Sequence, residues 1–256
     1  MGQTVIERGC EEVEVTGSLV FLLQSSSQYL PMPIDREFVA NTFIRGEGIE
    51  IGALHMPLRV PRSAKVRYVD RLSVAELRRH YPELNDKDLV RVDIIADGER
   101  LESISDSTQD FVIANHFIEH CQNPIGAALN MLRVLKPGGV LYLAIPDKRN
   151  SFDVDRPVTT IEHVMRDHQE GPEWSKRQHF EEWTRLVNKV QDDEAAEREI
   201  AQNLLIDYSI HYHVWTQAEM LELMVALRKI VSFEVELCLK NGPEVIFILR
   251  KNASQA

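Results

Sequence analysis

The sequence contains few cysteines and has no long apolar run. Its three cysteines, Cys10, Cys121 and Cys238, are far apart and form no C-x-x-C pair, so neither a disulfide framework nor a cysteine-rich zinc site is predicted. The longest apolar stretch, residues 18–23, is too short to cross a bilayer, and acidic residues stand where a signal peptide would be basic. We therefore expect a cytoplasmic protein that carries no export signal and does not associate with a membrane.

Basic residues are also in deficit. Lys plus Arg number 29 against 40 Asp plus Glu, which gives a formal net charge of −11. Nucleic-acid backbones bind basic surfaces, so this balance disfavours a nucleic-acid partner. The 256 residues, 44% of them hydrophobic and 27% charged, are typical of a soluble globular protein. This length predicts one compact unit with an appendage rather than two full domains.

Strand and helix patterns alternate from residue 46 onward, which predicts a mostly parallel sheet wrapped by helices. Capping-box patterns predict helices that begin after Ser73 and after Thr216. Asn123 followed by proline predicts a third helix start, and residues 137–139, Pro-Gly-Gly, predict its end. The expected strands are residues 48–51, 65–70, 90–96, 110–114, 140–145, 232–239 and 244–249.

The connections between these elements predict the domain organisation. The last two expected strands are separated by Lys-Asn-Gly-Pro at residues 240–243, which predicts an antiparallel hairpin that closes the sheet. The segment 147–214 is much longer than one crossover helix and is expected to be a helical lid or substrate insertion after the fifth strand. We therefore expect an N-terminal extension (1–45), a core (46–146), the insertion (147–214) and a C-terminal helix with hairpin (215–256).

Polar residues follow the first three expected strands, where a doubly wound sheet binds its ligands. Gly52 follows the first strand, but Leu54 and His55 stand where the phosphate-binding G-x-G-x-x-G pattern needs glycine. This absence disfavours a dinucleotide such as NAD or FAD, whose pyrophosphate needs that backbone cradle. Asp70 ends the second strand, where it is expected to accept from ribose hydroxyls, and Asp97 follows the third, where it is expected to accept from an adenine amino group. These features describe a pocket for S-adenosylmethionine (SAM), unless both aspartates only cap their loops.

The stretches EIGALHMPL, VRYVD and IIADGERLESI, followed by residues 110–147 with Glu119-His120 and LKPGG, resemble class I SAM-dependent methyltransferases of the type-11-like branch. The resemblance covers residues 46–147 and the terminal hairpin, although the first motif has fewer glycines than the family usually shows. It implies an α/β, Rossmann-like, doubly wound sheet of seven strands with the last strand antiparallel, together with the helical insertion. The cofactor-binding residues that it implies are Glu50, Gly52, Asp70, Arg71, Asp97, Gly98, Asn115 and His116.

Methyl transfer needs alignment of the acceptor, and it needs a base only when the acceptor loses a proton. Seven of the nine histidines fall between residues 116 and 213, which points to this part of the chain. The candidate bases are His120, His213 and Asp147, the last of which follows the fifth strand and has capping of the next turn as its alternative role. Glu119, His211 and Trp215 are candidate substrate contacts, because alternation places residues 211, 213 and 215 on one side of an extended segment.

The segment His116-Phe-Ile-Glu-His120 also has the H-x-x-E-H spacing of a zinc-dependent hydrolase. It follows a strand end and precedes Asn123-Pro124, so a single long metal-binding helix is disfavoured and a role in lining the pocket is preferred. Carboxylates and histidines beside a sugar-like diol leave Mg²⁺ open as an additional ion, because this ion prefers oxygen ligands. The spacing of the sequence does not decide between these roles.

We expect from the sequence a SAM-dependent methyltransferase that acts on a hydroxyl of a small molecule. The PDKRxxFDxxRP and HYHxWT segments resemble saccharide O-methyltransferases of bacteria, which implies a sugar or oligosaccharide as the polyhydroxylated acceptor. The alternatives are an N-methyltransferase for small amines, a SAM-binding non-catalytic partner protein, and a nicotinamide-dependent dehydrogenase. Self-association as a homodimer is left open.

Overall fold

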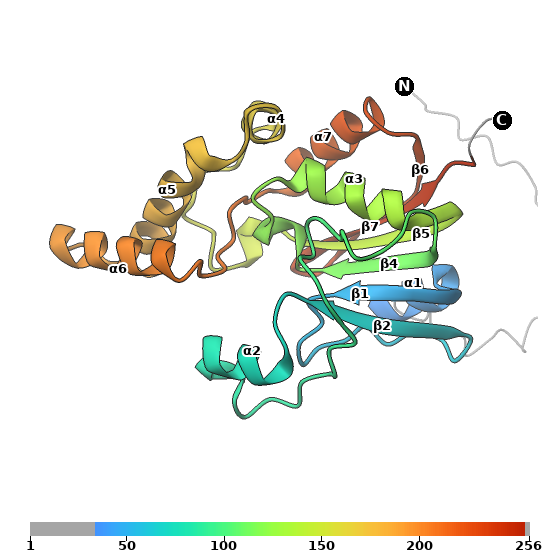
Figure 1. The fold of residues 1–256 in the computed structure, drawn as a ribbon. Helices are drawn as coiled ribbons and strands as arrows, with labels where there is room; N and C mark the ends of the chain where they lie inside the picture. Colours follow the sequence, from blue (N-terminus) through green and yellow to red (C-terminus); the bar gives the residue numbers. More distant parts are fainter. Residues whose placement is uncertain (1–33, 254–256) are drawn as a thin grey trace, which may run out of the picture. The chain divides into compact units, whose positions relative to one another are not determined.

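The computed structural model describes residues 34–253. The sequence features placed before residue 34, including Cys10 and the apolar stretch 18–23, lie outside the described residues. The described chain forms a seven-stranded sheet flanked by helices, with a group of helices beyond one end of the strands (Figure 1). Within residues 34–253, the helices are too short or too polar to cross a membrane.

The sheet has the strand order β3-β2-β1-β4-β5-β7-β6. Neighbouring strands from β1 to β5 are parallel, whereas β7 is antiparallel to both β5 and β6. This order confirms the Rossmann-like, doubly wound sheet of seven strands with its reversed last strand and terminal hairpin. The strands are β1 (Gly46–Ile51), β2 (Ala64–Asp70), β3 (Ile94–Ile95), β4 (Gln109–Asn115), β5 (Leu135–Pro146), β6 (Phe233–Asn241) and β7 (Glu244–Lys251).

Helix starts follow the local signals in the sequence. The Ser73 and Thr216 side chains each form a complete capping box, and the Asn123 side chain accepts from the backbone N–H of Gly126. The α-helices are α1 (Arg36–Phe43), α2 (Val74–His80), α3 (Pro124–Val134), α4 (Ile161–Glu170), α5 (Glu173–Glu182), α6 (Asp193–Leu205) and α7 (Gln217–Arg228). Shorter helical segments are Pro82–Leu84, Ile118–His120, Lys148–Asn150 and a π-helical turn at Trp183–Val187.

Two expected boundaries are wrong. The third strand comprises only Ile94–Ile95 instead of residues 90–96, because β3 is an edge strand that pairs with β2 alone and Ile95 remains 62% exposed. The Pro-Gly-Gly segment does not terminate α3 but lies within β5, since Leu135 already pairs with Gln109. Here the register shifts before Phe111 pairs with Val140, and Gly138 has a φ of +80° that a side chain rarely adopts.

Helices cover both faces of the sheet, and two apolar clusters fill the space between them. Helices α3 and α7 lie on one face and α1 on the other (Figure 1). The insertion after β5 contains α4, α5 and α6 and has a small cluster of its own, in which Phe180 and Ile200 pack against Ile210 and Tyr212. The insertion is thereby attached to the segment that precedes α7, close to the carboxyl ends of the strands.

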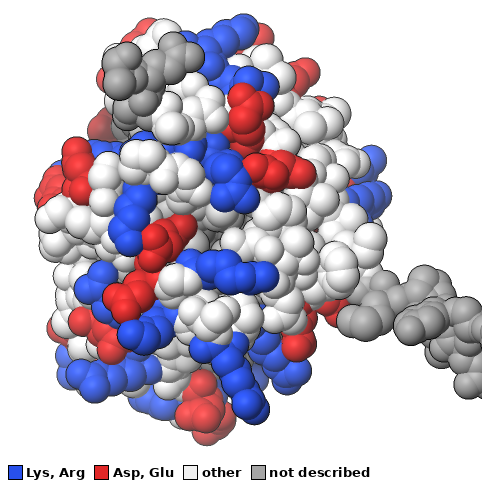
Figure 2. Space-filling model, turned by 90° about the vertical axis from the view of Figure 1, so that its right-hand side faces the viewer, with Lys and Arg blue, Asp and Glu red and all other residues white. Residues whose placement is uncertain are grey.

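Charged side chains of both signs occur together on the surface. Figure 2 shows Lys and Arg interspersed with Asp and Glu on the face that it presents. Exposed ion pairs such as Lys65–Glu47, with 2.8 Å between Nζ and Oε1, are typical of the described residues. Each such pair contributes little to the free energy of unfolding, because water screens exposed charges.

Candidate active site

A cavity of about 410 Å³ lies at the carboxyl ends of β1, β2 and β4, beside the point where the strand order reverses. Its volume falls within the range of about 300–1,000 Å³ that is usual for small-ligand sites. The structure brings together in its lining the predicted residues Gly52, Asp70, Arg71, Asp97, Gly98, His116 and His120. Other lining residues carry no signal in the sequence, among them Leu77, Tyr81, Glu99, Phe117, Gln122 and Tyr212.

Two glycines allow the backbone to border this cavity closely. Gly52 has a φ of +63°, in the left-handed region that disfavours a side chain. A Cβ atom on Gly98 would lie 2.6 Å from both Ile51 Cγ2 and Phe117 Cζ, which is closer than packed atoms can approach. Both positions therefore require glycine, and the main chain rather than a side chain forms this wall of the cavity.

Asp70 and Asp97 lie after neighbouring strands and each caps its own loop with one carboxylate oxygen. Asp70 Oδ1 accepts from the backbone N–H of Leu72 at 3.1 Å, and Asp97 Oδ1 accepts from that of Glu99 at 2.8 Å. Burial raises the pKa of the Asp70 carboxyl, although hydrogen bonds from the backbone N–H groups of Leu72 and Arg71 lower it. Asp97 Oδ2 also lies 3.7 Å from Arg100 Nε. Two carboxyls beside a glycine-bordered cavity fit the hydrogen-bond donors of the nucleoside of SAM.

Glu50 and Asn115 lie behind the cavity wall and do not line it in the described chain. The buried Glu50 carboxylate accepts from the backbone N–H of Leu58 at 2.9 Å and from Asn115 Nδ2 at 3.3 Å. Burial raises the pKa of Glu50 to about 7, although these hydrogen bonds lower it. Both side chains therefore hold the loop after β1 in place, so they support the cavity without bordering it.

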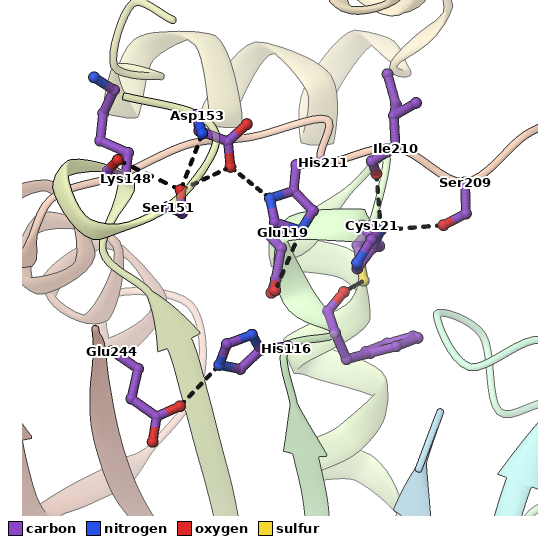
Figure 3. A network of polar contacts seen from close by, with 12 residues as sticks. His116, Glu119, Cys121, Lys148, Ser151, Asp153, Ser209, Ile210, His211 and Glu244 are labelled. Carbon is purple, nitrogen blue, oxygen red and sulfur yellow. Dashed lines mark hydrogen bonds and ion pairs between the residues drawn. The ribbon is translucent and has the colours of Figure 1, made fainter. Parts of the chain in front are cut away.

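His116 lines the cavity and is oriented by Glu244, which the sequence analysis did not single out. His116 Nε2 lies 2.8 Å from Glu244 Oε2, and Figure 3 shows this contact. Glu244 also accepts from Arg36 and from Asn241 Nδ2. Burial would raise the pKa of Glu244, but the hydrogen bonds from Arg36, His116 and Asn241 lower it to about 2. The first residue of β7 thus fixes a side chain at the end of β4.

His120 presents a neutral imidazole to the cavity. Its Nδ1 atom lies 2.9 Å from the carbonyl oxygen of Ile210 and 3.1 Å from Ser209 Oγ. Because a carbonyl can only accept, the proton is assigned to Nδ1, and Nε2 carries the lone pair. Burial, together with the neighbouring His211, lowers the pKa of His120 to about 3. The ring is thus uncharged at neutral pH, with a lone pair at Nε2 whose basicity is lowered by burial.

His211 lies next to His120 and belongs to a buried polar network (Figure 3). Its Nδ1 atom is 2.6 Å from Asp153 Oδ2, while its Nε2 atom is 3.9 Å from Glu119 Oε1. The Glu119 oxygens have no hydrogen-bond partner within the described residues, and burial raises the pKa of Glu119 to about 8. The role of Asp153 was not predicted from its FDxxRP segment, because only folding brings it to His211.

The structure separates the other predicted site residues from the cavity, since in the described chain Asp147, His213 and Trp215 do not line it. The buried Asp147 carboxylate accepts from Arg149 Nε at 2.9 Å, and these hydrogen bonds from Arg149 lower its pKa. His213 is buried and stacks on Trp215 with ring centroids 5.5 Å apart. Residues 213 and 215 therefore lie on one side of the segment as expected, whereas His211 packs against His120.

The sequence of the sheet-forming core matches one known domain family. Residues 48–143 match a family described as "Methyltransferase domain". A search of the curated proteins found no match. Together with the strand order, the domain match supports a class I SAM-dependent methyltransferase.

Similar solved structures include a putative Zn-dependent alcohol dehydrogenase from Rhodobacter sphaeroides, with 16% identity, a TM-score of 0.49, and coverage of 86% of this chain and 91% of that chain. A putative methyltransferase from Bacillus halodurans has 14% identity and a TM-score of 0.43, covering 84% of this chain and 96% of that one. A SAM-dependent methyltransferase from Methanosarcina mazei has 18% identity and a TM-score of 0.43, covering 82% and 94%.

Proposed function

We propose that this protein transfers a methyl group from SAM to a hydroxyl of a polyhydroxylated small molecule, a sugar or an oligosaccharide. The observation that carries the proposal is the presence in one cavity of Asp70, which suits a ribose, and of the His120 imidazole, whose Nδ1 is held by the carbonyl oxygen of Ile210. When bound, SAM supplies an electrophilic methyl group on a sulfonium centre. The protein then needs to hold the acceptor in line and to take up the hydroxyl proton.

The side chains of the cavity divide these tasks. Asp70 accepts hydrogen bonds from the ribose, and Gly52 and Gly98 allow close approach of the backbone. On the side of the insertion, Ser209 and Tyr212 offer hydroxyl groups that suit a polyhydroxylated acceptor. His120 Nε2 takes the proton of the reacting hydroxyl, while Nδ1 stays bonded to the carbonyl oxygen of Ile210 and keeps the ring in place.

Asp70→Ala tests the cofactor site. We expect SAM affinity to fall by about 2–3 kcal/mol in calorimetry, because a carboxylate that accepts from the ribose is lost. Asp88→Ala is the matched control, since Asp88 is exposed and does not line the cavity in the described chain, and it should bind SAM like the unmodified protein. Unchanged SAM affinity in Asp70→Ala, or stabilisation of the protein by NAD in place of SAM, would contradict the cofactor assignment.

His120→Ala tests the reaction. Formation of adenosylhomocysteine from a panel of sugars should fall by a factor of about 10²–10⁴ with SAM affinity retained, because a general base contributes in this range. His168→Ala, a histidine of α4 that does not line the cavity in the described chain, should keep full turnover. Turnover of amines that survives His120→Ala would favour the N-methyltransferase alternative instead. SAM binding without turnover of any acceptor would favour the non-catalytic partner protein.

A further inference from the structure

Four donor side chains converge between the insertion and the segment before α7, outside the cavity lining. His163 and Asp167 are four residues apart on α4 and so project from the same face of the helix. His179 comes from α5 and His213 from the segment that precedes α7. One donor atom of each lies within 4.8 Å of the donor atoms of the others. We call these residues, His163, Asp167, His179 and His213, the α4–α5 cluster.

The distances within the α4–α5 cluster are those of ligand atoms around a common centre. His163 Nε2 lies 3.1 Å from His179 Nε2 and 3.3 Å from Asp167 Oδ2. His213 Nε2 lies 3.6 Å from Asp167 Oδ2. In a tetrahedral zinc site with bonds of about 2.0–2.1 Å, neighbouring ligand atoms are separated by about 3.3–3.4 Å. The measured contacts lie close to that spacing.

Hydrogen bonds account for only part of the arrangement, because the contact between His163 Nε2 and His179 Nε2 is a hydrogen bond, whereas one oxygen of Asp167 has none. Asp167 is fully buried, and its Oδ1 atom accepts from Ser175 Oγ at 2.9 Å. Its Oδ2 atom, which faces the histidines, has no hydrogen-bond partner among residues 34–253. The carbonyl oxygen of Gln122 lies 3.4 Å from His213 Nε2, at the long limit for a hydrogen bond. A buried carboxylate oxygen is costly without a partner, and a cation between the donor atoms would supply one.

We propose that the α4–α5 cluster binds a Zn²⁺ ion. Three imidazoles and one carboxylate match the nitrogen and oxygen ligands that zinc prefers, whereas Mg²⁺ and Ca²⁺ prefer oxygen ligands only. Four protein ligands fill a tetrahedral site and leave no open position, which is typical of a structural rather than a catalytic zinc ion. Ser175 supports the site from outside, because it fixes the carboxylate through the oxygen that faces away from the ion.

The position of the α4–α5 cluster gives the ion a role in holding the insertion to the cavity. His213 follows Tyr212, which lines the cavity. The backbone N–H groups of Tyr212 and His213 both donate to the carbonyl oxygen of Glu119, at 2.8 Å and 3.2 Å respectively. The zinc ion would tie α4 and α5 to this segment. Trp215 stacks on His213 and Trp174 lies against His163, with centroids 4.6 Å apart, so indole rings border the site and limit the access of water.

Metal analysis of the full-length protein tests the proposal independently of methyl transfer. The protein, purified without chelator, is expected to contain one equivalent of zinc by mass spectrometry. His179→Ala and Asp167→Asn should each lower zinc occupancy at least tenfold, because each removes a ligand. His168→Ala is the matched control on the same helix and should keep the zinc of the unmodified protein. A Co²⁺-substituted protein should show the visible absorption of a tetrahedral site.

Stability measurements keep the test valid if a ligand variant folds poorly. A chelator should lower the melting temperature of the unmodified protein by several degrees, and added Zn²⁺ should restore it, because an ion that binds only the folded state stabilises it. His179→Ala should not respond to either treatment. The proposal is overturned if the unmodified protein holds no stoichiometric metal and Zn²⁺ shifts it no more than His179→Ala. It is likewise overturned if zinc persists in both ligand variants but is lost in His120→Ala, because the metal would then belong to the cavity.

Discussion

Replacement of Glu119 by glutamine should stabilise the protein, and the gain should grow with pH. Glu119 is 1% exposed, and its carboxylate oxygens have no hydrogen-bond partner among the described residues. Burial raises its pKa from 4.5 to about 8, so the carboxyl is protonated in the folded protein at neutral pH. In the unfolded chain, in contrast, this carboxyl is ionised at any pH well above its ordinary pKa of 4.5. Glutamine has the same shape and remains neutral.

The magnitude follows from the difference between the two pKa values. Between pH 4.5 and about pH 8, the folded state binds more protons than the unfolded state. The free energy of unfolding therefore falls as the pH rises through this window. At about 1.4 kcal/mol per pKa unit, the full penalty is about 5 kcal/mol above the folded pKa. From about pH 5 to about pH 9, the stability of Glu119→Gln relative to the unmodified protein should therefore increase by about 4 kcal/mol.

Urea unfolding of both proteins across this pH range measures the difference directly, because other titrating groups cancel in the comparison. Glu181→Gln is the control, since Glu181 is exposed and its replacement should change little at any pH. A difference that does not vary with pH would refute the reasoning. If Glu119→Gln were instead less stable than the unmodified protein at high pH, Glu119 would be ionised and paired with a cation. A metal ion bound by Glu119, His120 and His211 would have this effect.

Two further predictions concern the walls of the cavity. Glu244 has a pKa of about 2 in the folded state, against an ordinary value of 4.5. Its ionised form therefore contributes about 3 kcal/mol to the free energy of unfolding above pH 4.5, and this contribution is lost as the pH falls toward 2. Glu244→Gln should lower the free energy of unfolding at neutral pH and flatten its acid dependence in urea titrations, and an unchanged acid dependence would contradict the pairing with Arg36 and His116. Gly98→Ala should weaken SAM binding at least about tenfold in calorimetry, since its Cβ would press on Phe117, and unaltered binding would show that the wall yields freely.

The sequence alone determined the layout of the fold. The capping residues Ser73, Asn123 and Thr216 act on backbone groups two or three residues away, so the helix starts were readable without tertiary information. Strand order could be anticipated from the alternation of elements and the terminal hairpin. Because the carboxyl ends of parallel strands meet at one edge of a sheet, the positions of Asp70 and Asp97 in the cavity also followed from sequence.

Tertiary structure decided which polar side chains face the cavity. Asp147 and His120 both come after strands of the sheet. The Asp147 carboxylate is hydrogen-bonded by Arg149, whereas His120 is held by the carbonyl oxygen of Ile210 and lines the cavity. His211 contacts Asp153, whereas His213, two residues further on, contacts Asp167 and belongs to the α4–α5 cluster. Except for Arg149, which lies two residues after Asp147, each partner lies many residues away, and its distance depends on how the insertion packs. Local spacing determines backbone hydrogen bonds, whereas burial and the pairing of charges exist only once the chain has folded.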